Sequence, residues 1–329
     1  MIDYRPKLSL METQAAIRVL KHRFEVELCD SLHLTRASAP MFVKQGSGLN
    51  DNLNGVERPV TFDTAQTGEV LEVVHSLAKW KRYALYQYGI PVHQGIYTDM
   101  NAIRRDEICD SLHSLYVDQW DWEMVITEED RTEEFLKETV QKIYGSLLAT
   151  MKIVHENYPA LTQTLPGEIH FITTQELEDR YPHLTPKQRE DAAAREYGAV
   201  FLMKIGGLLA SGQKHDGRAP DYDDWNLNGD IILHYDLLDS AFEISSMGIR
   251  VDRSSLVSQL EAEHATDRLE LDFHKKLMDG TLPLSIGGGI GQSRLCMYLL
   301  EKAHIGEVQA SVWPDSELRY CKENGISLL

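Results

Sequence analysis

Cysteine is scarce in this chain of 329 residues, with only Cys29, Cys109, Cys296 and Cys321, which lie far apart. They form no Cys-x-x-Cys pair, which argues against a disulfide framework and suggests a reducing compartment. The thirteen histidines form no His-Glu-x-x-His pattern. We therefore expect no zinc site. The Gly-x-Ser-x-Gly elbow of many hydrolases is also missing.

Positive charge is scarce as well. The 33 lysines and arginines face 51 acidic residues, which gives a net charge of −18. Such a surface repels phosphate backbones and anionic lipids, so we expect neither nucleic acid nor membrane as a partner. The sequence has no apolar run long enough to cross a bilayer, and its first residues do not resemble a signal peptide. We expect a soluble cytoplasmic protein.

Hydrophobic residues make up 43% of the chain and charged residues 26%, which is ordinary for a globular protein. No repeat, low-complexity tract or linker marks a domain boundary. Antiparallel hairpins with helices between them predict an α+β fold with a mostly antiparallel central sheet, rather than a parallel Rossmann sheet.

Apolar spacing predicts the order of the elements. We expect a helix over 10–33, a loop over 44–58, a strand over 69–75, a helix from the N-cap Ser76 to Tyr88, two strands within 95–126 joined by the charged connection 104–110, a helix over 131–157, strand–helix–strand over 168–205, a polar loop over 211–228, strands near 229–235 and 241–251, and a helix near 254–278.

The run Gly-Gly-Gly-Ile-Gly-Gln-Ser-Arg at 287–294 is the most informative motif. Glycines allow a sharp turn and a close approach to a ligand. The apolar residues that follow predict a helix whose N-terminus favours anions, and Arg294 adds a charge suited to phosphate. The run is neither a Walker loop nor a good dinucleotide fingerprint. We interpret it as a ligand-facing turn, with a plain glycine hairpin as the alternative.

Polar and aromatic residues alternate in one expected strand. Gln119, Asp121 and Glu123 share one face, and Trp120 and Trp122 share the other. The pattern fits the floor of a polar pocket backed by a packed sheet. It fits a solvated sheet face equally well, so both interpretations stay open.

Lys81 lies on the apolar face of its expected helix, with Leu77, Leu85 and Tyr88. A lysine in that position usually extends to water, and otherwise it pairs with a carboxylate. Helical spacing alone favours the extension to water.

Two acids on the late hairpin, Asp230 and Glu243, come nearly opposite each other if the turn is centred near 236–237. Like charges repel there unless a cation lies between them, and paired carboxylates that also meet phosphates suit Mg²⁺. A register shift of one residue would separate them. Arg104, with Glu107 at the tip of the earlier hairpin, gains a role only if that tip folds over a ligand.

These features together resemble motifs 2 and 3 of class II aminoacyl-tRNA synthetases, and Pro40 resembles the motif 1 proline at their dimer interface. Longer runs are similar to the ammonia-dependent asparagine synthetases, the aspartate–ammonia ligases, and the resemblance extends essentially from end to end. Those runs are GLNDNLNG at 48–55, HSLAKWKR at 75–82, SLYVDQWDWE at 114–123, RAPDYDDW at 218–225, FEISSMGIRV at 242–251 and GGGIGQSRL at 287–295.

The resemblance implies one class II synthetase-like catalytic domain over 1–329, without an anticodon-binding domain, working as a homodimer. It implies that L-aspartate and ATP form β-aspartyl-AMP and pyrophosphate, and that ammonia then displaces AMP to give L-asparagine. The implied cofactors are ATP and Mg²⁺.

The resemblance also implies roles for individual residues. ATP would be bound by Arg104, Arg218, Asp223, Asp230, Glu243, Gly289, Gly291 and Arg294, and Mg²⁺ by Asp230 and Glu243. Aspartate would be bound by Asp51, Ser76, Lys81, Gln119, Asp121, Ser246 and Arg250. The catalytic residues would be Asp51, Lys81, Arg104 and Arg294. Lys81 is a candidate for a substrate carboxylate, and Asp51 for either ammonium or the α-ammonium group.

Two other functions stay open. An aspartyl- or asparaginyl-tRNA synthetase would share the adenylation step, but it needs a tRNA-binding surface, and a charge of −18 has the wrong sign. A non-catalytic paralogue that binds an amino acid would be expected to lose charged site residues, whereas Arg104, Asp230, Glu243 and Arg294 are all present.

Overall fold

The computed structural model describes residues 4–51 and 57–329. Within these ranges, the strands are β1 (Leu34–Arg36), β2 (Phe42–Lys44), β3 (Thr61–Asp63), β4 (Val70–Val73), β5 (Gly95–Ile103), β6 (Tyr116–Val125), β7 (His170–Thr173), β8 (Ala199–Met203), β9 (Asp223–Tyr235), β10 (Ser240–Arg250) and β11 (Ser285–Gly291). The helices are α1 (Leu10–Leu32), α2 (Ala78–Tyr88), α3 (Glu133–Asn157), α4 (Thr174–Arg180), α5 (Pro186–Tyr197), α6 (Arg253–Ala262), α7 (Asp272–Met278), α8 (Gln292–Leu299) and α9 (Asp315–Glu323), with the 3₁₀ helices η1 (Thr266–Glu270) and η2 (Ile305–Glu307).

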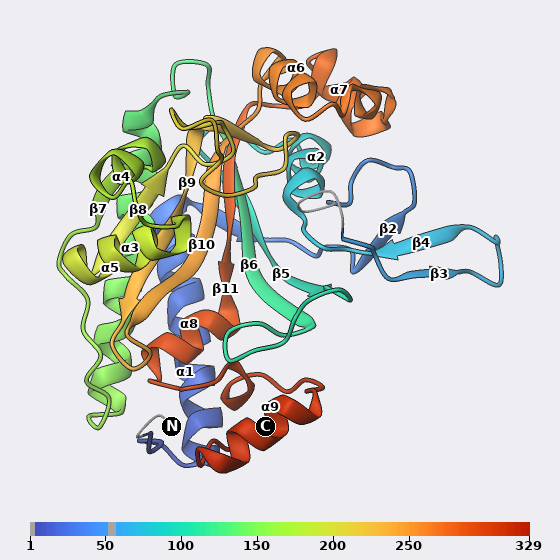
Figure 1. The fold of residues 1–329 in the computed structure, drawn as a ribbon. Helices are drawn as coiled ribbons and strands as arrows, with labels where there is room; N and C mark the ends of the chain where they lie inside the picture. The colour runs from blue at the N-terminus through green and yellow to red at the C-terminus, as the bar shows by residue number, and fades with distance from the viewer. Residues whose placement is uncertain (1–3, 52–56) are drawn as a thin grey trace.

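In the described residues, eight strands form a main sheet in the order β1-β5-β6-β11-β10-β9-β8-β7, and three form a small sheet in the order β2-β4-β3. Neighbouring strands from β5 to β8 are antiparallel, whereas β1 and β7 pair in parallel at the two edges. The small sheet projects away from the rest of the molecule (Figure 1). The α+β fold with a mostly antiparallel sheet is confirmed.

One face of the main sheet packs against α1, α3 and α8. Helix α1 begins at a capping box formed by Ser9 and Glu12, and it presents a buried stripe that includes Leu20 and Phe24. The ring of Phe24 lies 4.8 Å from that of Trp120, centroid to centroid. The tryptophans of β6 therefore face the helices, and its polar residues are directed to the opposite face.

The opposite face is covered at its two ends. Helix α2 packs Leu85 against Ile96 and Val125 at one end, and α5 packs Ala194 on Val200 and its neighbours at the other. Polar side chains of β6, β9 and β10 line a cavity on this face. The alternation within β6 thus marks a pocket floor rather than a solvated sheet face.

The glycine run is not a turn, and this expectation is wrong. Residues 285–291 form β11, a central strand between β6 and β10, which passes directly into α8 at the N-cap Gly291. A side chain does not fit at Gly287, Gly288 or Gly289, because an added Cβ would lie within 3.0 Å of atoms of the neighbouring strands. The sequence therefore correctly predicts the following helix, but not the strand.

Three element boundaries also differ from the expectations. The expected loop over 211–228 ends earlier, because β9 already pairs Asp223 with Arg250 of β10, and tertiary pairing outweighs low strand propensity. The single helix near 254–278 is divided into α6 and α7, with His264 at a positive φ of 53° between them. Two helices rather than one lie within 168–205, because Pro186 starts a new helix at its first position.

Helix α2 begins two residues after the expected N-cap. Leu77 holds the N-cap position, and the hydroxyl of Ser76 accepts a hydrogen bond from the Ala78 N–H at 3.1 Å. The expected loop over 44–58 includes residues 52–56, which lie outside the described residues. Across the described ranges, every helix is too short or too polar to cross a membrane.

Candidate active site

The cavity has a volume of about 490 Å³ and lies over β6, β9, β10 and β11. Every site residue that the family resemblance implies lines this cavity. These residues come from segments spread over more than two hundred positions of the chain. These residues are Asp51, Ser76, Lys81, Arg104, Gln119, Asp121, Arg218, Asp223, Asp230, Glu243, Ser246, Arg250, Gly289, Gly291 and Arg294. Their individual roles remain predictions.

Lys81 lies at the floor of the cavity with 1% of its surface exposed. Its Nζ donates to Asp121 Oδ1 and to the Gly288 carbonyl, both at 2.9 Å, and lies 3.9 Å from Glu123 Oε2. Burial lowers the pKa of Lys81, and the two carboxylates oppose that effect. The expectation that this lysine extends to water is wrong, because α2 packs its apolar face directly on the sheet.

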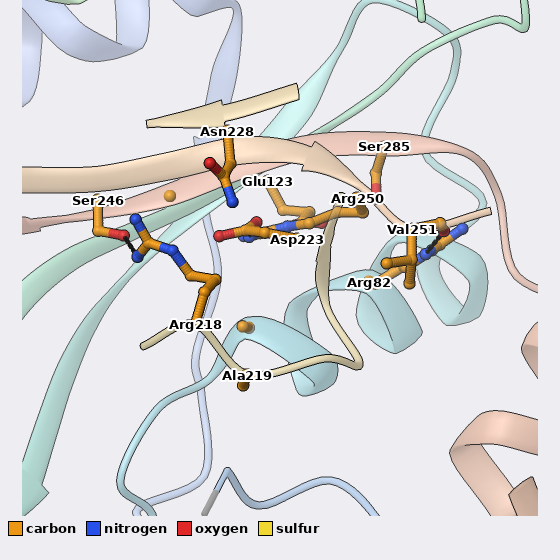
Figure 2. A network of polar contacts seen from close by, with 12 residues as sticks. Arg82, Glu123, Arg218, Ala219, Asp223, Asn228, Ser246, Arg250, Val251 and Ser285 are labelled. Carbon is orange, nitrogen blue, oxygen red and sulfur yellow. Dashed lines mark hydrogen bonds and ion pairs between the residues drawn. The ribbon is translucent and has the colours of Figure 1, made fainter. Parts of the chain in front are cut away.

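Arg250 forms the second cationic group of the floor, between Glu123 and Asp223 (Figure 2). Its Nε and Nη2 donate to Glu123 at 3.0 and 2.7 Å, and its Nη1 donates to Asp223. Burial would lower the pKa of Arg250, but the two carboxylates raise it above its ordinary value. These bonds use three of the five guanidinium N–H groups, so two N–H groups can still meet a ligand carboxylate.

The glycines of β11 make room for these polar side chains. A Cβ at Gly287 would lie 2.0 Å from Glu123 Oε2, and a Cβ at Gly289 would lie 2.3 Å from Gln119 Oε1. Gly287 pairs with Glu123, and Gly289 with Asp121, so the long side chains of β6 lie across the neighbouring strand. The strand carries glycines at these positions because the side chains of Glu123 and Gln119 occupy the space that a Cβ would fill.

We expect Gly287→Ala to destabilise the fold by about 3–5 kcal/mol, because it displaces Glu123 from Arg250 in a fully buried ion pair. Urea unfolding measures the change. Gly145→Ala is the control, because its Cβ would enter open space on α3, and it should stabilise the helix by up to about 1 kcal/mol. Equal unfolding midpoints for Gly287→Ala and the wild type would refute this account of the glycine run.

Two arginines stand at the mouth of the cavity. Arg294 donates to the Glu243 carbonyl at 2.9 Å and approaches His113 Nε2 at 3.1 Å. Arg104 lies 3.8 Å from Glu107, at the tip of the β5–β6 hairpin. Residues of this tip line the cavity, and a role of Arg104 toward a ligand there stays a prediction.

The predicted metal pair differs in register from the expectation. Glu243 pairs with Ile232 because the turn is centred one residue later than expected, and a β-bulge between residues 243 and 245 then places Ser246 opposite Asp230. The expected opposite placement is therefore wrong. Both acids still line the cavity, and burial together with Glu243 raises the pKa of Asp230 to about 7 against the opposing effect of Arg218.

Arg218 binds both Asp230 and Ser246 at the side of the cavity. Its Nη2 donates to Asp230 Oδ1 at 2.6 Å, and its Nη1 donates to the Ser246 hydroxyl. Figure 2 shows Arg218 beside Ser246, directed toward the strands from the segment that precedes β9. The electrostatic effect of Asp230 raises the pKa of Arg218, so this guanidinium stays charged.

Asp51 reaches the cavity on a loop that is held by hydrogen bonds. Asn50 Oδ1 accepts from the backbone N–H groups of Asp51 and His75, each at 2.9 Å. The Nδ1 of His75 lies 3.0 Å from the Asp51 carbonyl, and since a carbonyl only accepts, this nitrogen carries the proton. The loop is thereby attached to the start of α2, next to Ser76.

The sequence reasoning missed several cavity residues, among them His75, His113 and Tyr222. His75 directly precedes Ser76, and its position within the run 75–82 could have drawn attention to it. Tyr222 lies within the run 218–225 and carries the same signal, whereas His113 lies just outside the run 114–123 and reaches the cavity only in the folded chain.

Several polar atoms around the cavity have no hydrogen-bond partner within the part of the chain that the structure describes. They are Nε of Arg104 and Arg218, Oδ2 of Asp121 and Nε2 of His75, and all are buried. Buried polar groups are normally satisfied, so unsatisfied groups of both signs at one cavity fit a polar ligand with cationic and anionic ends.

The family model for aspartate–ammonia ligase matches residues 11–325. The chain belongs to the aspartate–ammonia ligase family. It is 60% identical to the aspartate–ammonia ligase of Fusobacterium nucleatum over 326 residues, which cover 99% of each chain. It is 58% identical to that of Clostridium perfringens (strain SM101), covering 99% of this chain and 98% of the relative. Family membership makes this chain a ligase, and the cavity is its candidate active site.

Solved structures of asparaginyl-tRNA synthetases share the fold of this chain. The asparaginyl-tRNA synthetase of Pyrococcus horikoshii, complexed with asparaginyl-adenylate, superposes with a TM-score of 0.66 at 14% identity, over 92% of this chain and 70% of that one. That of Entamoeba histolytica gives 0.63 at 12% identity, over 91% and 66%. The fold is thus that of a class II aminoacyl-tRNA synthetase catalytic region.

Proposed function

We propose that this protein makes L-asparagine from L-aspartate and ammonia, using ATP and releasing AMP and pyrophosphate through β-aspartyl-AMP. The observation that carries the proposal is one cavity with buried cations at its floor and arginines at its mouth. Family membership supports the same reaction.

The first half-reaction joins two anions and therefore needs fixed positive charge. An oxygen of the aspartate β-carboxylate attacks the α-phosphorus of ATP, and the bond to pyrophosphate breaks. Arg104 and Arg294 are placed at the cavity mouth, where they can hold the phosphates. Arg218 lies between the phosphate end and the floor.

The floor suits the amino-acid substrate. Lys81 and Arg250 can hold its carboxylates, while Asp121 and Gln119 offer oxygen acceptors to its α-ammonium group. Ser76 and Ser246 add hydroxyls at the edge of this floor. Each cation is already balanced by a protein carboxylate, so the floor is ordered before substrate binds.

In the second half-reaction, the lone pair of ammonia attacks the β-carbonyl carbon, and the bond to AMP breaks. The attacking nitrogen then loses a proton to a base. Asp51 is the candidate for this base and for holding ammonium, or else for holding the α-ammonium group of aspartate, because it reaches the cavity at the start of α2.

Mg²⁺ fits the pair of carboxylates formed by Asp230 and Glu243. Repulsion from Glu243 contributes to the raised pKa of Asp230, and a cation shared by the two carboxylates would relieve that repulsion. Carboxylate oxygens are ligands that suit Mg²⁺. When bound, the ion would neutralise charge on the triphosphate and the leaving pyrophosphate.

We expect Asp230→Asn and Glu243→Gln each to raise the Mg²⁺ concentration for half-maximal pyrophosphate exchange, on the order of 10-fold. Asp230 carries a proton below its pKa of about 7, so the wild-type requirement should increase as the pH falls through that value. Asp230→Asn should remove this pH dependence. Asp236→Asn, in the turn of the same hairpin, is the control, and identical Mg²⁺ titrations for all four proteins would exclude the metal role.

We also propose that the chain is a single catalytic unit without an anticodon-binding domain, that it works as a homodimer with Pro40 at the interface, and that it acts in the cytoplasm. The main sheet supports a single catalytic unit, because its strands come from residues as far apart as 34 and 291.

The decisive experiment is ³¹P NMR with amino-acid analysis after the protein is incubated with aspartate, ATP, Mg²⁺ and ammonium. AMP, pyrophosphate and asparagine should appear in equal amounts. ADP and phosphate would overturn the mechanism. Aspartate-dependent pyrophosphate exchange without asparagine would instead indicate a synthetase-like adenylating enzyme, and no exchange would indicate a non-catalytic amino-acid-binding protein.

A further inference from the structure

The helical connection between β10 and β11, residues 253–284, carries α6, η1 and α7. It lies at the same end of the main sheet as α2 (Figure 1). Of the described residues that line the cavity, none comes from this connection. Its contacts nevertheless converge on the segments that do line the cavity.

A buried cluster of charges joins the connection to the segment before β9. Asp221 Oδ2 accepts from Lys79 Nζ at 3.0 Å, His274 Nε2 at 2.9 Å and Arg268 Nη1 at 3.1 Å. Asp221 and His274 are fully buried. Burial would raise the pKa of Asp221, but Lys79 and its other partners hold it well below the ordinary value.

Helix α6 holds the same segment from a second side. The Nε2 of Gln259 donates to the carbonyls of Pro220 and Asp223, both at 2.9 Å, and its Oε1 accepts from the Trp225 N–H at 2.8 Å. The segment 218–223, which brings Arg218 and Asp223 to the cavity, is therefore fixed by α6, η1 and α7 together.

The connection also supports the loop that carries Asp51. A Cβ at Gly48 would lie 2.9 Å from Leu271 Cβ and 3.4 Å from His274 Nδ1, so the loop backbone rests directly against the start of α7. Leu49 packs on the apolar cluster of the connection. Two cavity-lining segments, the loop that carries Asp51 and the segment 218–223, thus share one support.

We infer that the helical connection positions the aspartate subsite, with Asp221 and Gly48 as its two points of attachment. This inference rests on the proposed function. Asp221 is a positioning residue, because it acts through Lys79, which is two residues from Lys81 on α2, and through the chain that leads to Asp223. A displacement of the loop that carries Asp51 changes the recognition of aspartate more than that of ATP, whose phosphates would lie toward Arg104 and Arg294.

Two glycine substitutions test the loop contact. Gly46 and Gly48 have nearly equal positive φ values, 76° and 75°, but a Cβ at Gly46 meets nothing within 4 Å. Both alanine variants therefore carry the same backbone strain, and only Gly48→Ala pushes against α7. We expect Gly48→Ala to raise the aspartate KM about 10-fold or more, with ATP KM little changed, and Gly46→Ala to leave both near wild type.

Asp221→Asn tests the charge cluster, and Glu178→Gln is its control because Glu178 pairs with Arg189 in a buried site between α4 and α5. Both variants should lose stability, and hydrogen–deuterium exchange should increase within 218–223 only for Asp221→Asn. Hydrogen–deuterium exchange does not depend on activity. A wild type that makes no asparagine would therefore contradict the proposed function without contradicting the inference about the helical connection. Matching aspartate KM values for Gly48→Ala and Gly46→Ala, or unchanged exchange within 218–223 in Asp221→Asn, would overturn the inference.

Discussion

Lys81→Met is expected to remove nearly all aspartate-dependent pyrophosphate exchange while ATP binding stays close to wild type. Lys81 is the buried ammonium at the floor of the cavity, and its loss removes a charge-assisted bond to substrate worth about 1.5–3 kcal/mol. It also leaves Asp121 and Glu123 facing the substrate carboxylates without this cation, so repulsion adds to the loss. Isothermal calorimetry with each substrate measures the effect.

The variant needs a control for folding, because removing one partner of a buried ion pair costs about 3–5 kcal/mol of stability. Lys81→Met/Asp121→Asn removes both charges of the pair and should recover part of that stability without recovering aspartate binding. If folded Lys81→Met binds aspartate as tightly as the wild type, Lys81 does not contact the substrate.

Arg294→Met is expected to slow adenylation by roughly 10²–10³-fold, because one fixed cation is lost where charge moves from the α-phosphate to pyrophosphate. Arg294 is partly exposed at the cavity mouth, with a backbone carbonyl and a histidine as its hydrogen-bond partners, so its loss should leave the fold intact. Pre-steady-state pyrophosphate release measures the step.

Arg195→Met removes an equal charge near the hairpin turn, where Arg195 pairs with the exposed Asp239. It should keep wild-type rates and thereby control for the change in net charge. A rate for Arg294→Met within a few-fold of the wild type would exclude a role for this arginine in the transition state.

Local signals in the sequence were sufficient for much of the fold. Helix α1 follows from the apolar spacing of Ala16, Leu20 and Phe24, and β5 and β6 follow from two alternating runs about a charged connection. The alternation of residues 119–123 correctly separated the polar from the aromatic face, because the side chains of a strand alternate whatever the strand packs against.

Other features depended on neighbours that the sequence does not specify locally. The glycine run suggested a turn, but pairing with β6 and β10 makes it a central strand, and the side chains of Glu123 and Gln119 occupy the space that a Cβ at Gly287 or Gly289 would fill. The hairpin turn is centred one residue later than expected and a β-bulge follows Glu243, so the partner of Asp230 is Ser246 rather than Glu243. A single inserted residue has no signature in periodicity, yet it moves a carboxylate along the partner strand.

The sequence by itself determined the family, the α+β class and the set of charged residues, because long motifs and side-chain periods are properties of the chain alone. Only the tertiary structure decided how those charges are used. Lys81 is buried against Asp121 rather than solvated, Arg250 is shared between Glu123 and Asp223, and Asp221 ties a distant helical connection to the site. Such pairings depend on which segments meet in space, and desolvation gives each pairing an energy that sequence spacing does not contain.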